Sequence, residues 1–433
     1  MADISKITIE SGTYNIKDAF LRNKIDYVTP EEFGAVGDGE NDDTASIQNA
    51  INYCITNKVG LLFHNKTYLI TDTLTITGDS FNLYCDGELL IDDNITLLDV
   101  TGDNHKIYIN KMTSSSRNGI GLYSHGRLAY CNIEINNIND FDIGISLDTS
   151  SNSTGGILYN YFKSSIIIAN KCINLNGNTR YVNQNYFYMG GLMGITGIYS
   201  EEITETNGEY NGNCFYNCGF ENLTTAIDIN NMTNSVFENF RLYESVTGTY
   251  FIKLNNSIKN LFKSNITSAI LQNTKISDNT TSRQNANIFD CFITLYGSVT
   301  SQYARKCLSY NGLFEVIENA TLPVRYSFGN ATINTSNLGS LTIYNEFSCY
   351  NSESDVIINL DSRYTENNNY SNDLVLFISY IAGNHNVQVF DSNNNKVFDL
   401  DNFRSQVTSG KTALFKFTLY NGTLYPYLIY KTT

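Results

Sequence analysis

Charged and tyrosine side chains recur at one position of a repeat in the middle of the chain. Each repeat has a polar residue, one spacer and an apolar anchor, and the residue after the anchor is in turn Lys163, Tyr188, Tyr216, Glu238, Lys263 and Asp290. Two carboxylates, one protonated and one charged, can hydrolyse a glycosidic bond when they lie about 5–9.5 Å apart. The pattern therefore predicts an acid–base pair made of Glu238 and Asp290.

The neighbours of this pair suggest a role for each carboxylate. Glu244 carries a like charge and favours the protonated form of Glu238, whereas Lys263 favours the charged form of Asp290. We therefore expect Glu238 to be the acid and Asp290 the base, unless Arg241 outweighs Glu244. The residues expected to bind the substrate are Tyr188, Tyr216, Lys263, Arg241, Glu221 and Glu244. The two tyrosines would be the platform on which sugar rings stack.

The apolar anchors show which elements must position these residues. They recur roughly every 25 residues, a period typical of stacked repeats. The anchors are Ile107, Ile133, Phe162, Phe187, Phe215, Phe237, Phe262 and Phe289. Short strands between Gly and Asn turns, with no helix pattern among them, favour an all-β parallel β-helix with the anchors inside. We also expect Asn217, Asn239 and Ser264 to form an inward side-chain ladder.

The stretch "FGAVGDGENDDTASIQNAI", residues 33–51, predicts one capped helix ahead of the strands. Asp42 or Asp43 is a suitable N-cap. The apolar stripe that follows has helical spacing and consists of Ile47, Ala50, Ile51 and Cys54. Such a helix can cover the open end of a sheet.

Three segments follow from the patterns along the chain. Residues 1–27 are too few to hold a core of their own and are expected to be an adaptor for attachment. Residues 28–310 carry the helix and the repeats. Residues 311–433 have longer alternating strands and Asn-rich loops, which predicts a separate antiparallel β domain.

Composition excludes several classes of partner. The chain has 433 residues and a net charge of −15, which disfavours nucleic acid and anionic membranes. It has no apolar run long enough for membrane insertion and no signal peptide at its start, so we expect synthesis and folding in a cytoplasm. The nine cysteines lack a C-x-x-C pair and are expected to be small buried side chains. We expect no metal site and no cofactor.

The motif of residues 33–51, followed by Gly60 to Ile70, resembles the pectate-lyase-like superfamily of right-handed parallel β-helices. The resemblance is sequence-specific over Val28 to Ile76 and architectural from there to residue 310. The adaptor-like start and the distinct C-terminal domain resemble bacteriophage tailspikes and capsule depolymerases. This resemblance implies a homotrimer in the virion tail, attached to a tail or baseplate protein through its N-terminal segment. It also implies a protein that binds, and often cleaves, a bacterial surface polysaccharide.

Two other functions remain open on the same fold. A polysaccharide lyase would need a uronic acid substrate, with His105 or His125 as base and Arg117 or Arg127 facing the uronate. The Gly-His-Gly and Arg-x-Lys elements of the pectin-degrading branches are absent, which argues against a pectinase-type site. A non-catalytic receptor-binding tail protein would need no acid–base pair. An alternative acidic site is the loop that carries Glu201, Glu202, Glu205 and Glu209.

Overall fold

A computed structural model describes residues 6–9, 12–15, 27–150, 155–242, 247–264, 271–272, 275–296, 301–310, 313–319, 331–334, 342–344, 346–350, 355–360, 375–380, 385–407, 410–420 and 423–431. The chain divides into two compact units, Met1–Cys218 and Gly219–Thr433, which are described in turn. Among the described residues, no helix is long and apolar enough to cross a membrane.

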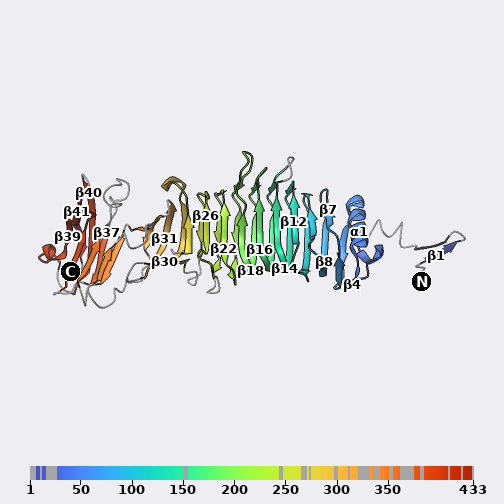
Figure 1. Ribbon diagram of the computed structural model, residues 1–433, viewed down its shortest axis with the longest axis horizontal. Coiled ribbons are helices and arrows are strands. Elements are labelled where there is room, and N and C mark those ends of the chain that lie inside the picture. Colours follow the sequence, from blue (N-terminus) through green and yellow to red (C-terminus); the bar gives the residue numbers. More distant parts are fainter. Residues whose placement is uncertain are drawn as a thin grey trace. The chain divides into compact units, whose positions relative to one another are not determined.

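Unit 1 is a stack of parallel strands with one α-helix near its start (Figure 1). A short antiparallel hairpin, β1 (Lys6–Ile9) and β2 (Gly12–Asn15), precedes it. The following elements are β3 (Tyr27–Val28), η2 (Pro30–Phe33), β4 (Asp38–Asp42), α1 (Thr44–Asn57), β5 (Gly60–Phe63), β6 (Thr67–Ile70), β7 (Leu74–Ile76), β8 (Asn82–Ile91), β9 (Thr96–Val100), β10 (Gly102–Asp103), β11 (Lys106–Ser114), β12 (Ile120–His125), β13 (Leu128–Ala129), β14 (Asn132–Asp148), β15 (Ile157–Leu158), β16 (Tyr161–Asn176), β17 (Val182–Asn183), β18 (Tyr186–Ser200), β19 (Tyr210–Asn211) and β20 (Cys214–Tyr216). The brief helix expected in the adaptor lies outside the described residues.

The double aspartate of the N-terminal motif fixes the start of α1. Asp43 is the N-cap residue, but its side chain makes no capping hydrogen bond, and the preceding Asp42 Oδ1 accepts hydrogen bonds from the backbone N–H and the hydroxyl of Thr44. Asp43 instead accepts from the backbone N–H groups of Val36 and Gly37, at 2.6 and 3.0 Å. Gly37 has a φ of +69°, a conformation that favours glycine. The motif therefore ties a tight turn to the helix that covers the first rung.

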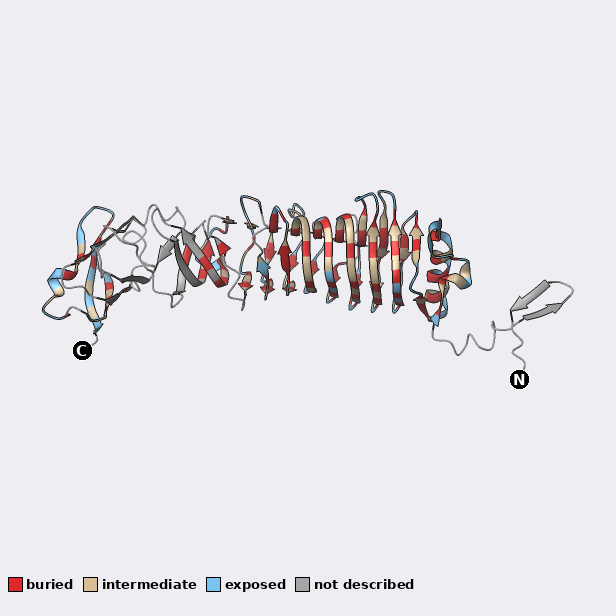
Figure 2. Cartoon of the chain, turned by 90° about the horizontal axis from the view of Figure 1, so that it is seen from below, coloured by how far each residue is buried: buried red, intermediate tan, exposed pale blue. Residues whose placement is uncertain are grey.

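The strands of unit 1 pair in parallel and in the register that the anchors predict. Ile107 pairs with Ile133, which pairs with Phe162, and Phe162 pairs with Phe187. Phe187 in turn pairs with Phe215, and the three phenylalanine rings stack at centroid distances of 5.1 and 4.7 Å. All these anchors are buried, and buried residues alternate with partly exposed ones along the strands (Figure 2). The expected parallel β-solenoid is thus confirmed.

A buried asparagine ladder also runs through the core, but not through Asn217 and Asn239, whereas Ser264, the third expected position, is buried. Asn217 is exposed, and both Asn217 and Asn239 have positive φ, so they occupy turns. The ladder is formed instead by the first residue of each repeat. In unit 1, Asn160 Nδ2 donates to Asn185 Oδ1 at 3.0 Å, and Asn185 Nδ2 donates to Asn213 Oδ1 at 3.2 Å. These amides satisfy buried backbone groups where each rung turns.

Unit 2 begins with short parallel strands and then changes to antiparallel pairing. Its first elements are β21 (Gly219–Glu221), β22 (Thr225–Asn230), β23 (Met232–Thr233), β24 (Val236–Glu238), β25 (Arg241–Leu242), β26 (Ile252–Asn255), β27 (Leu261–Lys263), β28 (Leu271–Gln272), β29 (Ile276–Asp278), η4 (Arg283–Asn285), β30 (Asn287–Tyr296), β31 (Ser301–Tyr310) and β32 (Leu313–Asn319). Phe237, Phe262 and Phe289 stack in its core at 4.6 Å. The pairs β30–β31 and β31–β32 are antiparallel.

The C-terminal part of unit 2 consists of β-strands in two four-stranded sheets and of β34 (Thr342–Tyr344), which pairs with β32. One sheet contains β33 (Ala331–Asn334), β36 (Val356–Asn359), β38 (Val387–Phe390) and β39 (Lys396–Asp399), and η7 (Leu400–Phe403) follows β39. The other contains β35 (Glu346–Tyr350), β37 (Val375–Tyr380), β40 (Ala413–Tyr420) and β41 (Thr423–Lys431). The expected antiparallel pairing is confirmed for β37–β40, β40–β41 and β38–β39, whereas β33–β36, β36–β38 and β35–β37 are parallel.

Candidate functional site

The residues that follow the anchors form one outward column in unit 1. The register places Tyr84, Tyr108, Glu134 and Lys163 side by side on successive rungs. Tyr188 and Tyr216 continue the same column. Because each rung contributes one residue, the column brings together side chains that are far apart in the sequence.

Tyrosine rings in and beside this column stack on one another. Tyr84 stacks on Tyr108, and Tyr188 lies between Tyr161 and Tyr216, each pair at a centroid distance of 4.7 Å. Both faces of the Tyr188 ring are therefore covered by other rings. Its edge and hydroxyl remain available to a ligand, which differs from the face-on platform that the sequence suggested.

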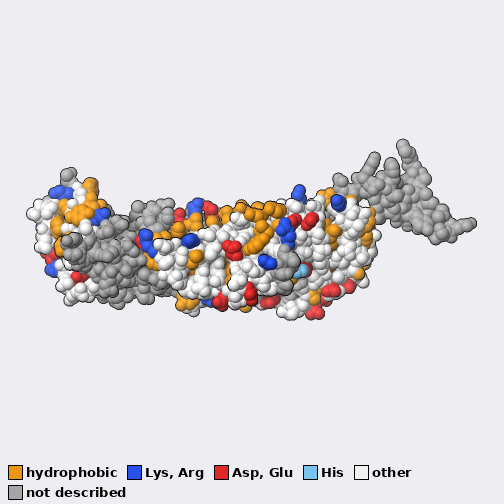
Figure 3. Space-filling model, turned by 90° about the horizontal axis from the view of Figure 1, so that it is seen from above, with side chains coloured by type: hydrophobic (Ala, Val, Ile, Leu, Met, Phe, Trp, Pro, Cys, Tyr) orange, Lys and Arg blue, Asp and Glu red, His pale blue; other side chains and the backbone are white. Residues whose placement is uncertain are grey.

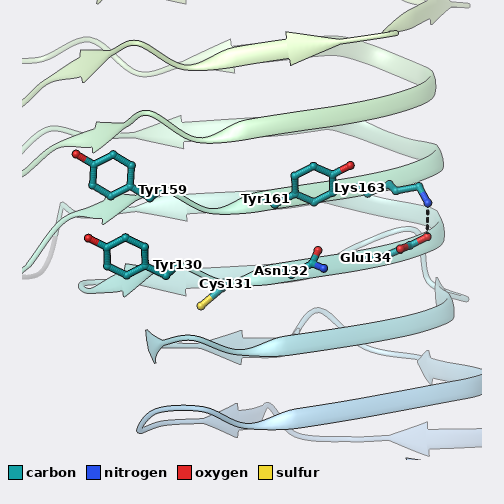
Figure 4. Close-up of a pocket in the computed structure, with 7 residues that line it drawn as sticks. All are labelled: Tyr130, Cys131, Asn132, Glu134, Tyr159, Tyr161 and Lys163. Carbon is teal, nitrogen blue, oxygen red and sulfur yellow. Dashed lines mark hydrogen bonds and ion pairs between the residues drawn. The ribbon is translucent and has the colours of Figure 1, made fainter.

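The column borders a hollow of about 570 Å³ between two rungs of unit 1 (Figure 4). Its lining residues are Tyr130, Cys131, Asn132, Glu134, Tyr159, Tyr161 and Lys163. Tyr130 and Tyr159 stack at 5.4 Å on one side of the hollow, while Lys163 Nζ donates to Glu134 Oε1 at 2.6 Å on the other. This hydrogen bond, together with the charge of Glu134, raises the pKa of Lys163. The hollow thus has an aromatic wall and a charged wall.

A second hollow of about 290 Å³ shares Asn132 and Glu134 with the first. Its remaining lining residues are Tyr27, Asn82, Leu83, Tyr84, Lys106, Ile107 and Tyr108. We call the two hollows together the Asn132 furrow. Lys106 is exposed, and Asn136 Nδ2 donates to the hydroxyl of Tyr108 at 2.9 Å, which orients that phenol. The furrow presents phenol, amide, ammonium and carboxylate groups on a partly apolar surface.

The expected acid–base pair lies in unit 2. Glu238 pairs with Lys263, and Lys263 pairs with Asp290, so the three residues occupy successive rungs in the order that the repeat predicts. At the usual strand spacing the two carboxylates are two rungs, or about 9.6 Å, apart along the stack. Arg241 is exposed and Glu221 is partly exposed, and Glu244 lies outside the described residues.

One ion pair lies in this column. Lys263 Nζ donates to Glu238 Oε1 at 3.0 Å. The pKa of Lys263 is raised first by this hydrogen bond and by the charge of Glu238, and less by Asp290. A carboxylate that holds a lysine is stabilised in its charged form. Lys263 contacts Glu238, whereas the sequence suggested that it would act on Asp290, and the acid and base roles stay a prediction.

The alternative acidic loop and most of the lyase candidates have structural partners. Glu201 accepts from the Tyr199 hydroxyl at 3.2 Å and lies 3.4 Å from Lys171, and the Glu209 carboxylate accepts from Asn183 and Asn211. Glu202 and Glu205 lie in the same loop.

Among the lyase candidates, His105 is buried, and burial lowers its pKa. Arg127 is hydrogen-bonded to Asp103 and Arg117 lies 3.6 Å from Asp140, and both arginine side chains remain exposed, at 52% and 82%. His125 differs from these residues, because its ring is partly exposed and pairs with Asp99. In the described part of the chain, no cluster of three or more His, Cys, Asp or Glu residues could hold a metal ion.

Sequence reasoning missed the residues that form most of the furrow. Tyr108 and Glu134 follow the anchors Ile107 and Ile133, so reading the same column toward the N-terminus would have found them. Tyr130 and Tyr159 had no such signal. Both have positive φ, 58° and 57°, in turns between rungs, where tyrosine is unusual. Figure 3 shows one face of the molecule, on which apolar side chains lie in strips beside charged ones.

The stacked parallel strands and the Asn132 furrow define the chain as a parallel β-solenoid with aromatic side chains on its outer surface. No family model matches the sequence. A curated relative, "Depolymerase, capsule K30/K69-specific" of Klebsiella phage K64-1, is 42% identical over 67 residues. That segment is 15% of this chain and 9% of the relative, so the chain matches only a small part of that protein's length.

Solved structures with similarity to the chain include phage tailspike proteins. The phiAB6 tailspike, solved with oligosaccharides of the Acinetobacter baumannii surface polysaccharide, is 14% identical. The match covers 99% of this chain and 70% of that one, with a TM-score of 0.41. The Agl-KA catalytic domain is 13% identical, with 77% and 56% of the two chains covered and a TM-score of 0.35. The expected resemblance to capsule depolymerases thus agrees with the 67-residue similarity to a curated depolymerase.

Proposed function

We propose that this protein is a phage tailspike-like protein that binds a bacterial surface polysaccharide in the Asn132 furrow and degrades it. The observation that carries this proposal is the lining of the furrow. Sugars offer both hydroxyl groups and apolar C–H surfaces, which suit phenol, amide and charged side chains placed around an open hollow. The 67-residue similarity to a capsule depolymerase supports the same class of ligand.

We assign degradation to glycosidic hydrolysis by Glu238 and Asp290. The furrow lining contains a single carboxylate, Glu134, and hydrolysis requires two. Glu238 and Asp290, two rungs apart, are at the wide end of the carboxylate separations found in inverting enzymes. With Lys263 on Glu238, Glu238 activates the water and Asp290 protonates the leaving oxygen.

Incubation of the purified protein with candidate host polysaccharides tests this assignment. We expect chain length, followed by size-exclusion chromatography, to fall without an unsaturated product that absorbs in the ultraviolet. Glu238→Gln should lower the rate about 100-fold or more, with binding retained. Cleavage by this variant at the wild-type rate would reject Glu238 as a catalytic residue.

The two alternatives make different predictions in the same assay. A lyase would give the ultraviolet-absorbing product, and the exposed Arg117 would be available to face the uronate. A receptor-binding protein without catalysis would bind the polysaccharide and leave its length unchanged. The ion pair between Lys263 and Glu238 favours this second alternative, because it occupies one of the two carboxylates that hydrolysis would need.

We also propose that the protein is a homotrimer in the virion tail, attached to a tail or baseplate protein through residues 1–27. The outer strand of one C-terminal sheet supports assembly. On β41, Tyr425, Tyr427 and Ile429 alternate along the strand and are 53%, 45% and 50% exposed. Exposed apolar side chains on an edge strand are suited to contact another subunit. Light scattering should give a mass about three times that of the chain, and a monomeric mass at micromolar concentration would reject the trimer.

A further inference from the structure

A histidine–carboxylate pair lies on unit 1 among residues that line neither hollow of the Asn132 furrow. His125 Nδ1 is 2.9 Å from Asp99 Oδ1, and their side chains are 39% and 14% exposed. The register explains how they meet, because Tyr123 on β12 pairs with Asp99 on β9, and His125 is two residues further along β12. The residues just before them in the chain, Leu98 and Leu122, are buried in the core. Because successive side chains of a strand point to opposite faces, Asp99 and Tyr123 point outward.

Tyr123 completes the cluster. Its ring stacks on the ring of His125 with centroids 5.6 Å apart, and its hydroxyl donates to Asp148 Oδ2 at 3.4 Å. The contact is long for an O–H···O bond, so a better acceptor can replace it. Burial and then the charge of Asp148 raise the pKa of Tyr123 to about 12, which keeps the phenol protonated near neutral pH.

We propose that Asp99, Tyr123 and His125 form a second hydrolytic site, which removes acyl ester groups from sugar hydroxyls. Asp99 accepts the Nδ1–H of His125, which fixes the tautomer and leaves the Nε2 lone pair directed away from Asp99. This is the arrangement in which a histidine acts as a general base. His125 and Tyr123 are the catalytic residues, and Asp99 is a positioning residue.

The reaction uses water alone as co-substrate. Nε2 of His125 takes a proton from water while the water oxygen forms a bond to the acyl carbon. The Tyr123 hydroxyl donates to the oxyanion that develops on the acyl oxygen. The tetrahedral intermediate then collapses, the bond from the acyl carbon to the sugar oxygen breaks, and the proton on Nε2 passes to that sugar oxygen. The products are a carboxylic acid and a free sugar hydroxyl.

The charges around the site favour this reaction over elimination from a uronate. Asp99 and Asp148 both face the cluster and would repel a substrate carboxylate. The nearest guanidinium along the chain, Arg127, is hydrogen-bonded to Asp103. A glycosidic bond would need a stronger acid at its leaving oxygen than a phenol with a pKa of about 12. A neutral acyl ester is not repelled by the two carboxylates and does not need a strong acid at its leaving oxygen.

Acetate release from chemically O-acetylated dextran, followed by NMR, tests this inference on the full chain. It does not depend on chain hydrolysis, so it can fail or succeed independently of the proposed function. His125→Gln should lower kcat/KM about 100-fold or more, and Asp99→Asn should lower kcat with KM unchanged. Tyr123→Phe should lower kcat about 10-fold or more.

His64→Gln is the matched control, because His64 is an exposed histidine elsewhere in unit 1. It should retain the wild-type rate, which separates the site from general imidazole reactivity. Circular dichroism of each variant should match the wild-type spectrum. A wild-type rate equal to that of buffer would overturn the proposal, as would equal rates for His125→Gln and His64→Gln.

Discussion

Phe262 is the position at which the stacked core can be tested most sharply. Its ring is fully buried and lies between those of Phe237 and Phe289, with both centroid distances at 4.6 Å. Truncation to Ala removes a buried aromatic side chain and leaves a cavity, which costs about 3–5 kcal/mol. Substitution by Leu retains much of the volume but loses two aromatic pairs, each worth about 0.5–1.5 kcal/mol.

Urea unfolding measures both effects. We expect Phe262→Leu to lower the free energy of unfolding by about 1–3 kcal/mol and Phe262→Ala to lower it by about 3–5 kcal/mol. Tyr250→Ala is the control, because Tyr250 is exposed in the same unit, and it should change stability by less than about 0.5 kcal/mol. Equal destabilisation by Phe262→Ala and Tyr250→Ala would show that the ring column is not a packed core.

Two further predictions concern polar groups in unit 1. Asn185→Leu should destabilise the protein by at least about 2 kcal/mol in urea unfolding. The reason is that the backbone N–H of Asn160 and the carbonyl of Ile157 lose their buried partner. An unchanged free energy of unfolding would mean that the asparagine ladder adds no stability. Asp42 has a pKa below its ordinary value of 3.8, chiefly because Thr44 donates to it. Its contribution to stability is therefore present above about pH 4 and is lost as the pH falls through the folded-state pKa, so Asp42→Asn should flatten the acid side of the stability curve. An unchanged curve would show that the hydrogen bonds from Thr44 to Asp42 add no stability.

The sequence predicted the fold well because the period and the anchors are local signals. The spacing from Ile107 to Phe289 places one apolar side chain at the same point of each rung, and the backbone register follows. The asparagine ladder was misplaced because Asn is suited both to buried polar positions and to turns with positive φ. Only the fold distinguishes Asn185, which is buried, from Asn217, which is exposed.

The candidate site was predicted less completely. Register along the column is determined by the repeat, so the order Glu238, Lys263, Asp290 was predictable. Which carboxylate Lys263 binds depends on side-chain conformation, and this has no signal in the spacing. The furrow depends on small side chains such as Asn132 beside large ones such as Tyr161, a difference in size that becomes a hollow only when rungs stack.

Binding of surface oligosaccharide by the wild-type protein and by Asn132→Trp tests the central claim most directly. Asn132 is exposed at the junction of the two hollows, so an indole there fills the furrow without entering the core. Isothermal titration calorimetry on an oligosaccharide prepared from the host polysaccharide should give binding that Asn132→Trp weakens about 10-fold or more, a loss of about 1.4 kcal/mol. Thr281→Trp, at an exposed position in unit 2, should bind like wild type. Equal affinity for wild type and Asn132→Trp would contradict the assignment of the furrow as the polysaccharide site.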